Sequence, residues 1–224
     1  MPHKNDKEHI GAIVKARTLA LQRNSSSLAR RAIQDIGRLT TDPTVGWLAK
    51  AQALDSRQDW EGLLAHARQW VTARPEDAMA WFCLGVAYEL LNQSDKALDA
   101  FQQALRLNPE HPTAWHGLGR ACNKLGHPAM GVDAYQQALR LNPDDATSWN
   151  SLGEAYSQLG QLTTAAEANQ QAVRLNPENA IVWYNLGVAY AEMGRRDQVM
   201  EVYRKLKGLD AAKAERFFQK VVLP

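Results

Sequence analysis

The stretch from Trp81 to Pro109, WFCLGVAYELLNQSDKALDAFQQALRLNP, decides the fold because its pattern of large and small residues returns at a fixed interval. Five tryptophans lie 34 residues apart: Trp47, Trp81, Trp115, Trp149 and Trp183. The same interval separates the Leu-Gly pairs at Leu84-Gly85, Leu118-Gly119, Leu152-Gly153 and Leu186-Gly187, and the prolines Pro75, Pro109, Pro143 and Pro177. A period of this length predicts helical units that cannot bury their apolar faces alone and must stack into a solenoid.

Each unit reads as two antiparallel helices. Trp81, Leu84 and Tyr88 fall at i, i+3 and i+7, which is one stripe of a first helix. Asn92 follows in a predicted turn, where later units carry a glycine, and both residue types tolerate the left-handed backbone. A second stripe of Ala97, Phe101 and Ala104 predicts a second helix, which ends at Asn108-Pro109 because proline cannot continue it. The unit is therefore a helical hairpin.

These residues resemble the tetratricopeptide repeat (TPR) family, whose pattern of Trp, Leu-Gly, Tyr, Ala, Phe and Pro is met at Trp81, Leu84, Gly85, Tyr88, Ala97, Phe101 and Pro109. Individual units depart from the pattern: Cys122 replaces the first Tyr, Gly131 the first Ala, and Asn169 the Phe. The resemblance implies an all-α protein, a right-handed α-solenoid of stacked antiparallel helix pairs that form a TPR superhelix.

The interval also predicts the organisation of the chain. We expect a flexible N-terminus (1–8), a degenerate capping helix pair (9–43), a divergent TPR (44–77), four TPR units (78–111, 112–145, 146–179 and 180–209) and a C-terminal capping helix (210–224). Phe217 is in phase with the tryptophans and is expected to cover the last apolar interface. Trp70 is expected in the core, whereas the sequence leaves open whether Trp60 is buried or exposed.

Composition argues against several classes of function. The net charge is +2 with no block of like charges, which gives no support for binding to nucleic acid or to a membrane surface. No apolar run approaches the length of a membrane span. Cys83 and Cys122 lack a CxxC arrangement, so we expect two reduced thiols in a cytoplasmic protein. Histidine pairs with metal-ligand spacing, phosphate loops and nucleophile motifs are missing, so the sequence predicts neither an enzyme nor a cofactor or metal.

The remaining functional signal lies in side chains that change from unit to unit. Similarity to TPR proteins implies that first helices line a concave groove. The candidate groove residues are Phe82, Val86, Glu89, His116, Arg120, Asn123, Lys124, Asn150, Glu154, Tyr184, Asn185 and Val188. They predict a peptide with apolar anchors around an acidic centre. The competing interpretation is an ordinary solvated wall in which Arg120 pairs with Glu154.

The sequence therefore favours a non-enzymatic adaptor or scaffold that binds a peptide segment of another protein in the concave groove. The alternative is an accessory or regulatory subunit of a larger enzyme or secretion assembly, or a self-associating scaffold that uses the convex face. The identity of the partner and the oligomeric state stay open.

Overall fold

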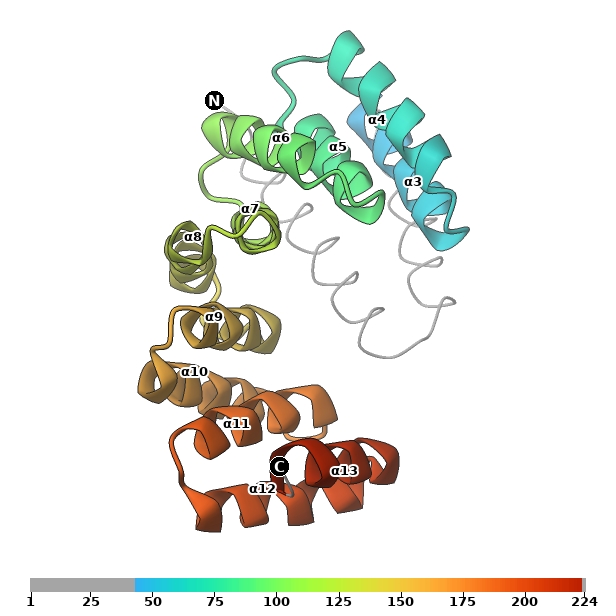
Figure 1. Ribbon diagram of the computed structural model, residues 1–224. Helices are drawn as coiled ribbons and strands as arrows, with labels where there is room; N and C mark the ends of the chain where they lie inside the picture. Colours follow the sequence, from blue (N-terminus) through green and yellow to red (C-terminus); the bar gives the residue numbers. More distant parts are fainter. Residues whose placement is uncertain (1–42, 223–224) are drawn as a thin grey trace. The chain divides into compact units, whose positions relative to one another are not determined.

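The computed structural model describes residues 43–222 and falls into two compact units, divided between Ala73 and Arg74 (Figure 1). Every regular element among the described residues is a helix, so the prediction of an all-α protein is confirmed. The predicted N-terminus at 1–8 and nearly all of the predicted helix pair at 9–43 lie outside the described residues.

Unit 1 contains two described helices, α3 (Pro43–Ser56) and α4 (Trp60–Ala73). Trp70 is fully buried at 0% exposure, as expected, and its ring stacks on Trp47 with a centroid separation of 6.0 Å. Trp60, whose burial was open from sequence, is half-buried at the start of α4. The two tryptophans of α4 therefore differ, and only Trp70 anchors the helix pair.

Unit 2 contains four hairpins in the described residues, each made of a first and a second helix. They are α5 (Ala78–Leu90) with α6 (Ser94–Leu107), α7 (Pro112–Lys124) with α8 (Pro128–Leu141), α9 (Ala146–Gln158) with α10 (Leu162–Leu175), and α11 (Ala180–Glu192) with α12 (Arg196–Leu209). Helix α13 (Ala211–Phe217) and a π-helical turn (Phe218–Val222) follow. Each second helix packs against the first helix of the next hairpin, so neighbours in sequence are neighbours in space.

The turns inside the hairpins have the predicted left-handed backbone. Asn92 has a φ of 57°, and the glycines at the same place in later hairpins, Gly126, Gly160 and Gly194, have φ values of 78°, 71° and 71°. A left-handed residue reverses the chain directly after the first helix, which favours the glycine or asparagine found there in unit 2. In unit 1 Gln58 takes the same place, with a φ of 57°.

A repeated hydrogen bond explains why tryptophans and prolines share one interval. In each hairpin of unit 2 the indole Nε1 donates to the backbone carbonyl of the proline six residues earlier. The pairs are Trp81 with Pro75, Trp115 with Pro109, Trp149 with Pro143 and Trp183 with Pro177, and each bond measures 2.8 Å. Each tryptophan thus ties its first helix to the linker that precedes it.

Glycines on the first helices make room for side chains from the second helices. A Cβ built on Gly85 would lie 2.7 Å from the Phe101 ring, and one on Gly119 would lie 2.6 Å from the Tyr135 ring. In the last hairpin the neighbour of Gly187 is Phe217 of α13, which is fully buried with Val202 and Leu206. These close approaches fix the distance between the two helices of each pair.

The first helices lie on the inner side of unit 2. Helix α5 contacts α7, α7 contacts α9, and α9 contacts α11, whereas no comparably extensive contact joins successive second helices among the described residues. Helices that approach one another more closely occupy the inside of a bend. The exposed faces of α5, α7, α9 and α11 are called the inner wall below, and those of α6, α8, α10 and α12 the outer face.

Candidate functional site

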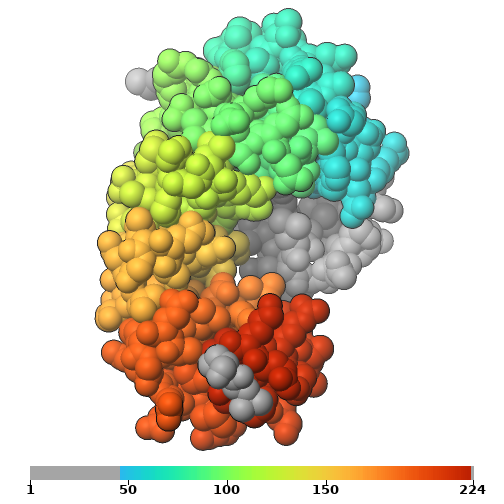
Figure 2. All heavy atoms as spheres, in the orientation of Figure 1, coloured from blue at the N-terminus to red at the C-terminus, as the bar shows by residue number. Residues whose placement is uncertain are grey.

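All twelve residues proposed from the sequence lie on first helices of unit 2. Helix α5 carries Phe82, Val86 and Glu89; α7 carries His116, Arg120, Asn123 and Lys124; α9 carries Asn150 and Glu154; α11 carries Tyr184, Asn185 and Val188. The successive hairpins that bear them form consecutive bands from green to red in Figure 2. The structure adds the contacts among these residues, which the sequence did not predict.

The first bridge between neighbouring helices is an ion pair between α5 and α7. Arg120 Nε lies 2.8 Å from Glu89 Oε1, and the Arg120 side chain is still 50% exposed while that of Glu89 is 12% exposed. The sequence had offered Glu154 as the partner of Arg120, and the structure instead pairs Arg120 with the preceding hairpin. The charge of Arg120 is thus partly balanced by Glu89, and half of its surface remains accessible.

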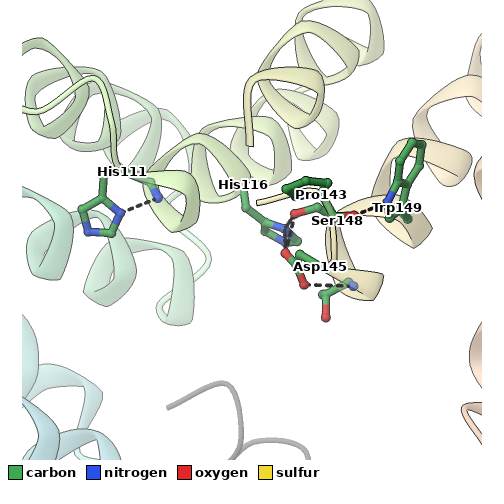
Figure 3. Close-up of polar contacts among 8 residues, drawn as sticks. His111, His116, Pro143, Asp145, Ser148 and Trp149 are labelled. Atoms are coloured by element: carbon green, nitrogen blue, oxygen red, sulfur yellow. Dashed lines mark hydrogen bonds and ion pairs between the residues drawn. The ribbon is translucent and has the colours of Figure 1, made fainter. Parts of the chain in front are cut away.

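The second bridge is a hydrogen bond between α7 and α9, shown in Figure 3. His116 Nδ1 lies 2.8 Å from Ser148 Oγ, and Ser148 Oγ donates to Asp145 Oδ2 at 2.6 Å. Because the hydroxyl proton goes to Asp145, the Ser148 oxygen accepts from His116, and Nδ1 is the protonated nitrogen of the imidazole. Asp145 also caps α9 by accepting from the Thr147 backbone N–H at 3.1 Å.

Burial keeps His116 neutral in this bridge. Desolvation lowers the pKa of His116 from 6.5 to about 4; nearby Asp145 opposes this shift and Arg120 adds to it. Asp145 Oδ2 lies 4.0 Å from His116 Nδ1, and its attraction for a protonated imidazole is smaller than the loss of hydration. At neutral pH the imidazole therefore acts as a hydrogen-bond donor and not as a cation.

The residue types Ser, His and Asp meet here without the geometry of a catalytic triad. In a triad the histidine lies between the serine and the aspartate, so that it takes the serine proton. Here Ser148 lies between the other two side chains, donates its proton to Asp145 and is 1% exposed. The set joins two helices, and it gives no support for nucleophilic catalysis.

The third bridge joins α9 and α11 through two amides. Asn185 Nδ2 donates to Asn150 Oδ1 at 3.0 Å. The inner wall thus carries one polar contact at each junction: an ion pair, a histidine–serine bond and an amide–amide bond. Five of the twelve proposed residues take part in these contacts, and they are therefore occupied with each other or with Ser148.

One residue from each first helix forms a row along the inner wall. These residues, called the central row below, are Val86, Arg120, Glu154 and Val188, and they stand 34 positions apart. Arg120 and Glu154 are exposed, and the two valines are half-buried. Glu154 has no ion-pair partner within residues 43–222, and neither does Lys124. The row presents an apolar, a basic, an acidic and an apolar side chain in succession.

Two aromatic residues of the proposed set lie differently from the expectation. Phe82 was expected as an apolar seat in the groove, but it is 5% exposed and stacks on His111 at 4.6 Å, with Phe101 at 6.0 Å. Tyr184 is half-buried, with its ring edge-on to Phe217 at 5.5 Å. Phe82 belongs to the core because α6 and the N-terminal cap of α7 cover it, so it offers a ligand little surface.

Buried amides are a feature that sequence reasoning missed. Asn169 is 1% exposed, and neither atom of its amide has a hydrogen-bond partner among the described residues. It stands where Phe101 and Tyr135 stand in the earlier hairpins, against Gly153. Asn123 also buries an unpartnered Oδ1, which lies in the space that a Cβ on Gly131 would need. The sequence signals for these buried amides were two departures from the TPR pattern: Asn169 stands in place of Phe, and Gly131 stands in place of Ala.

Unit 1 holds a shallow pocket of about 290 Å³, lined by Gly46, Trp47, Lys50, His66 and Gln69. His66 Nε2 donates to the Trp47 carbonyl at 2.8 Å, and the His66 ring stacks on the Trp47 ring at 5.0 Å. His66 stands where later hairpins carry Ala100, Ala134 and Ala168, so unit 1 holds a larger ring at this repeat position. No motif in the sequence pointed to this histidine.

Other types of site have no support in the part of the chain that the structure describes. That part contains no group of three His, Cys, Asp or Glu side chains placed to hold a metal ion. None of its helices combines the length and apolar character that a membrane crossing requires. Cys83 and Cys122 are buried thiols, not a disulfide, and burial raises the pKa of Cys122.

Stacked helical hairpins with a 34-residue period define a TPR α-solenoid. The family model for the C-terminal domain of cilia and flagella-associated protein 70, a TPR domain, matches residues 17–214. The chain belongs to this family. No curated protein matches it.

Solved TPR structures share the fold at low sequence identity. MamA matches with a TM-score of 0.67 and 22% identity over 74% of this chain and 96% of its own. YrrB, described as a TPR protein with an unusual peptide-binding site, matches with a TM-score of 0.66 and 24% identity over 84% of this chain and 98% of its own. TTC0263, a thermophilic TPR protein of Thermus thermophilus, matches with a TM-score of 0.63 and 20% identity over 80% of this chain and 98% of its own. The family and fold are those of protein-interaction scaffolds.

Proposed function

We propose that this chain is a non-enzymatic adaptor of the cytoplasm that binds a peptide segment of a partner protein along the central row. One observation carries the proposal. Val86, Arg120, Glu154 and Val188 come from four successive first helices at one repeat position, and they differ in chemistry while the packing residues around them recur. Variation at an accessible position of a constant scaffold is typical of a recognition surface.

The row suggests the chemistry of the peptide. A ligand with the order apolar, acidic, basic, apolar places a carboxylate on Arg120 and a cation on Glu154, with side chains on the two valines. Lys124 lies one turn beyond Arg120 on α7 and adds a second positive charge beside the acidic position. The acidic part of this peptide is shorter than the acidic centre that the sequence predicts, because Glu89 already balances part of the charge of Arg120. The peptide-binding site ascribed to YrrB supports a peptide as ligand by analogy.

Selection from a displayed library of random peptides tests the proposal. We expect selected peptides to show the order apolar, acidic, basic, apolar, and Arg120→Gln and Glu154→Gln each to weaken their binding about tenfold. Arg216→Gln provides the matched control, because Arg216 is exposed on α13 and away from the row. Peptides that bind all three variants as tightly as the parent chain would place the binding site elsewhere.

A further inference from the structure

The outer face of unit 2 carries two rows of opposite charge. Every second helix has a carboxylate at one repeat position, forming an acidic row of Asp99, Asp133, Glu167 and Glu201. Three of these helices have an arginine seven residues later, forming a basic row of Arg106, Arg140 and Arg174. All seven side chains are exposed. The inner wall has no such regularity.

The two rows do not neutralise each other within one chain. Seven residues are two helical turns, so the acidic and basic positions share one stripe of the helix but lie about 10 Å apart. None of the ion pairs of residues 43–222 includes a member of either row. Arg106 donates to Gln103, and Arg140 Nε donates to Gln137 Oε1 at 3.0 Å, which orients both guanidinium groups along their helices. Seven charges thus face solvent in a fixed pattern.

We propose that this outer face pairs with the outer face of a second copy of the chain. A two-fold axis lays the acidic row of one copy on the basic row of the other, and the reverse contact follows by symmetry. Helices α6, α8, α10 and α12 lie on the same side of unit 2, so both rows are available together (Figure 1). Neither a uniformly acidic nor a uniformly basic partner matches both rows, whereas a second copy related by a two-fold axis parallel to the rows does.

The charges also select a register. Around an axis that runs parallel to the rows and midway between them, each second helix faces its own counterpart, so Asp99 faces Arg106 of the second copy, Asp133 faces Arg140, and Glu167 faces Arg174. Glu201 then faces Gly208, beside which Lys205 and Lys207 are exposed. Every arginine of the basic row gains a carboxylate. An axis parallel to the helices would instead reverse their order and lay each row on the same row of the second copy, which brings like charges together, so we infer the first register.

Sedimentation velocity of the full chain over a concentration series tests the pairing. Exposed ion pairs are individually weak and are screened by salt, so we expect a dimer near ~100 µM protein in about 20 mM salt and a monomer in about 0.5 M salt. Glu167→Arg and Arg140→Glu are each expected to weaken the dimer about tenfold or more. A chain that stays monomeric at low salt across the series overturns the proposal.

The charge swap gives the sharper result. In the inferred register the double variant Asp133→Arg/Arg140→Glu rebuilds both contacts with inverted charges, so we expect its dimer to recover to within about threefold of the parent chain. The double variant Glu167→Arg/Arg140→Glu does not rebuild a pair and is expected to stay monomeric. Recovery by the second variant and not the first would overturn the register. Lys220→Glu, an exposed change on the last helical turn, is the control and should leave the dimer unchanged.

Discussion

Phe101 on α6 fits against Gly117 on α7: a Cβ built on Gly117 would come within 2.6 Å of Phe101 Cζ. The same ring lies against Gly85 on α5, so it sits between the first helices of two successive hairpins. Two glycines and one ring thus set the spacing of a whole hairpin junction. The spacing in turn positions the charges of the inner wall, because Glu89 and Arg120 lie on the same two helices.

Replacing Gly117 by alanine should therefore destabilise the stack. The added Cβ forces a fully buried ring to move, at a cost of about 1–3 kcal/mol that the better helix propensity of alanine only partly offsets. Gly208→Ala is the matched control, because a Cβ at Gly208 of α12 meets no atom within 4 Å. Urea unfolding should show a loss for the first variant and none for the second. Equal stabilities would contradict the close-packing account.

The residues at the hairpin junctions change together along the stack. Phe101 meets Gly117; Tyr135 and Ser151 stand at the same repeat positions at the next junction, and Asn169 and Asn185 at the one after that. As the residue on the first helix grows from glycine to serine to asparagine, the inserted residue changes from a ring to an amide. The largest first-helix residue of the three, Asn185, thus stands at the junction with the smallest inserted residue, Asn169.

This pairing predicts a coupling between Asn169 and Asn185. Asn169→Phe alone should crowd Asn185, and Asn185→Gly alone should leave a void, so each single variant lowers the melting temperature. The double variant Asn169→Phe/Asn185→Gly reproduces the Phe101–Gly117 junction and should be more stable than the sum of its parts by about 1–3 kcal/mol. It also removes the Asn169 amide, which is buried without a partner among the described residues. Additive effects in a double-mutant cycle would show that the two positions do not touch.

The His116 bridge predicts a dependence of stability on pH. The imidazole has a folded pKa of about 4, below its ordinary 6.5, so between these values the unfolded chain binds a proton that the folded chain does not. The contribution of neutral His116 to the free energy of unfolding is fully present above pH 6.5 and falls by up to about 3 kcal/mol as the pH approaches 4. His116→Gln should flatten this part of the pH profile of the unfolding free energy. An exposed-site control, His127→Gln, should leave the profile unchanged.

Phe217 predicts the contribution of the C-terminal helix. Its fully buried ring fills the space above Gly187, so Phe217→Ala should cost about 3–5 kcal/mol, and truncation of residues 210–224 should expose the apolar surface of α11 and α12. Phe218→Ala should cost less, because Phe218 is half-buried against Tyr203. Thermal melts of the two variants test the order. A larger loss for Phe218→Ala would contradict the proposed capping role.

The period of the chain was enough to predict the hairpins, the left-handed turns at Asn92 and its equivalents, and the core position of Trp70. These features depend on local backbone preferences and on apolar stripes, and both are visible in a single sequence. The repeated pattern also predicted that the proposed groove residues lie on first helices, because every unit has the same order of helices.

The side-chain contacts between hairpins could not be predicted from the period of the sequence. Glu89 and Arg120 lie 31 residues apart, His116 and Ser148 lie 32 apart, and Asn150 and Asn185 lie 35 apart, so none of the three bridges keeps the period of the chain. Side-chain direction and length decide each pair. The burial of Phe82 escaped prediction for the same reason, because it depends on His111 of the next hairpin.

The central claim is that equal hairpins stack so that their first helices together form a surface that binds a peptide. The most direct measurement is backbone NMR of the full chain while a library-selected peptide is added. The account predicts shift changes centred on Val86, Arg120, Glu154 and Val188, with α6, α8, α10 and α12 unaffected. Changes confined to the outer face, or to unit 1, would contradict it.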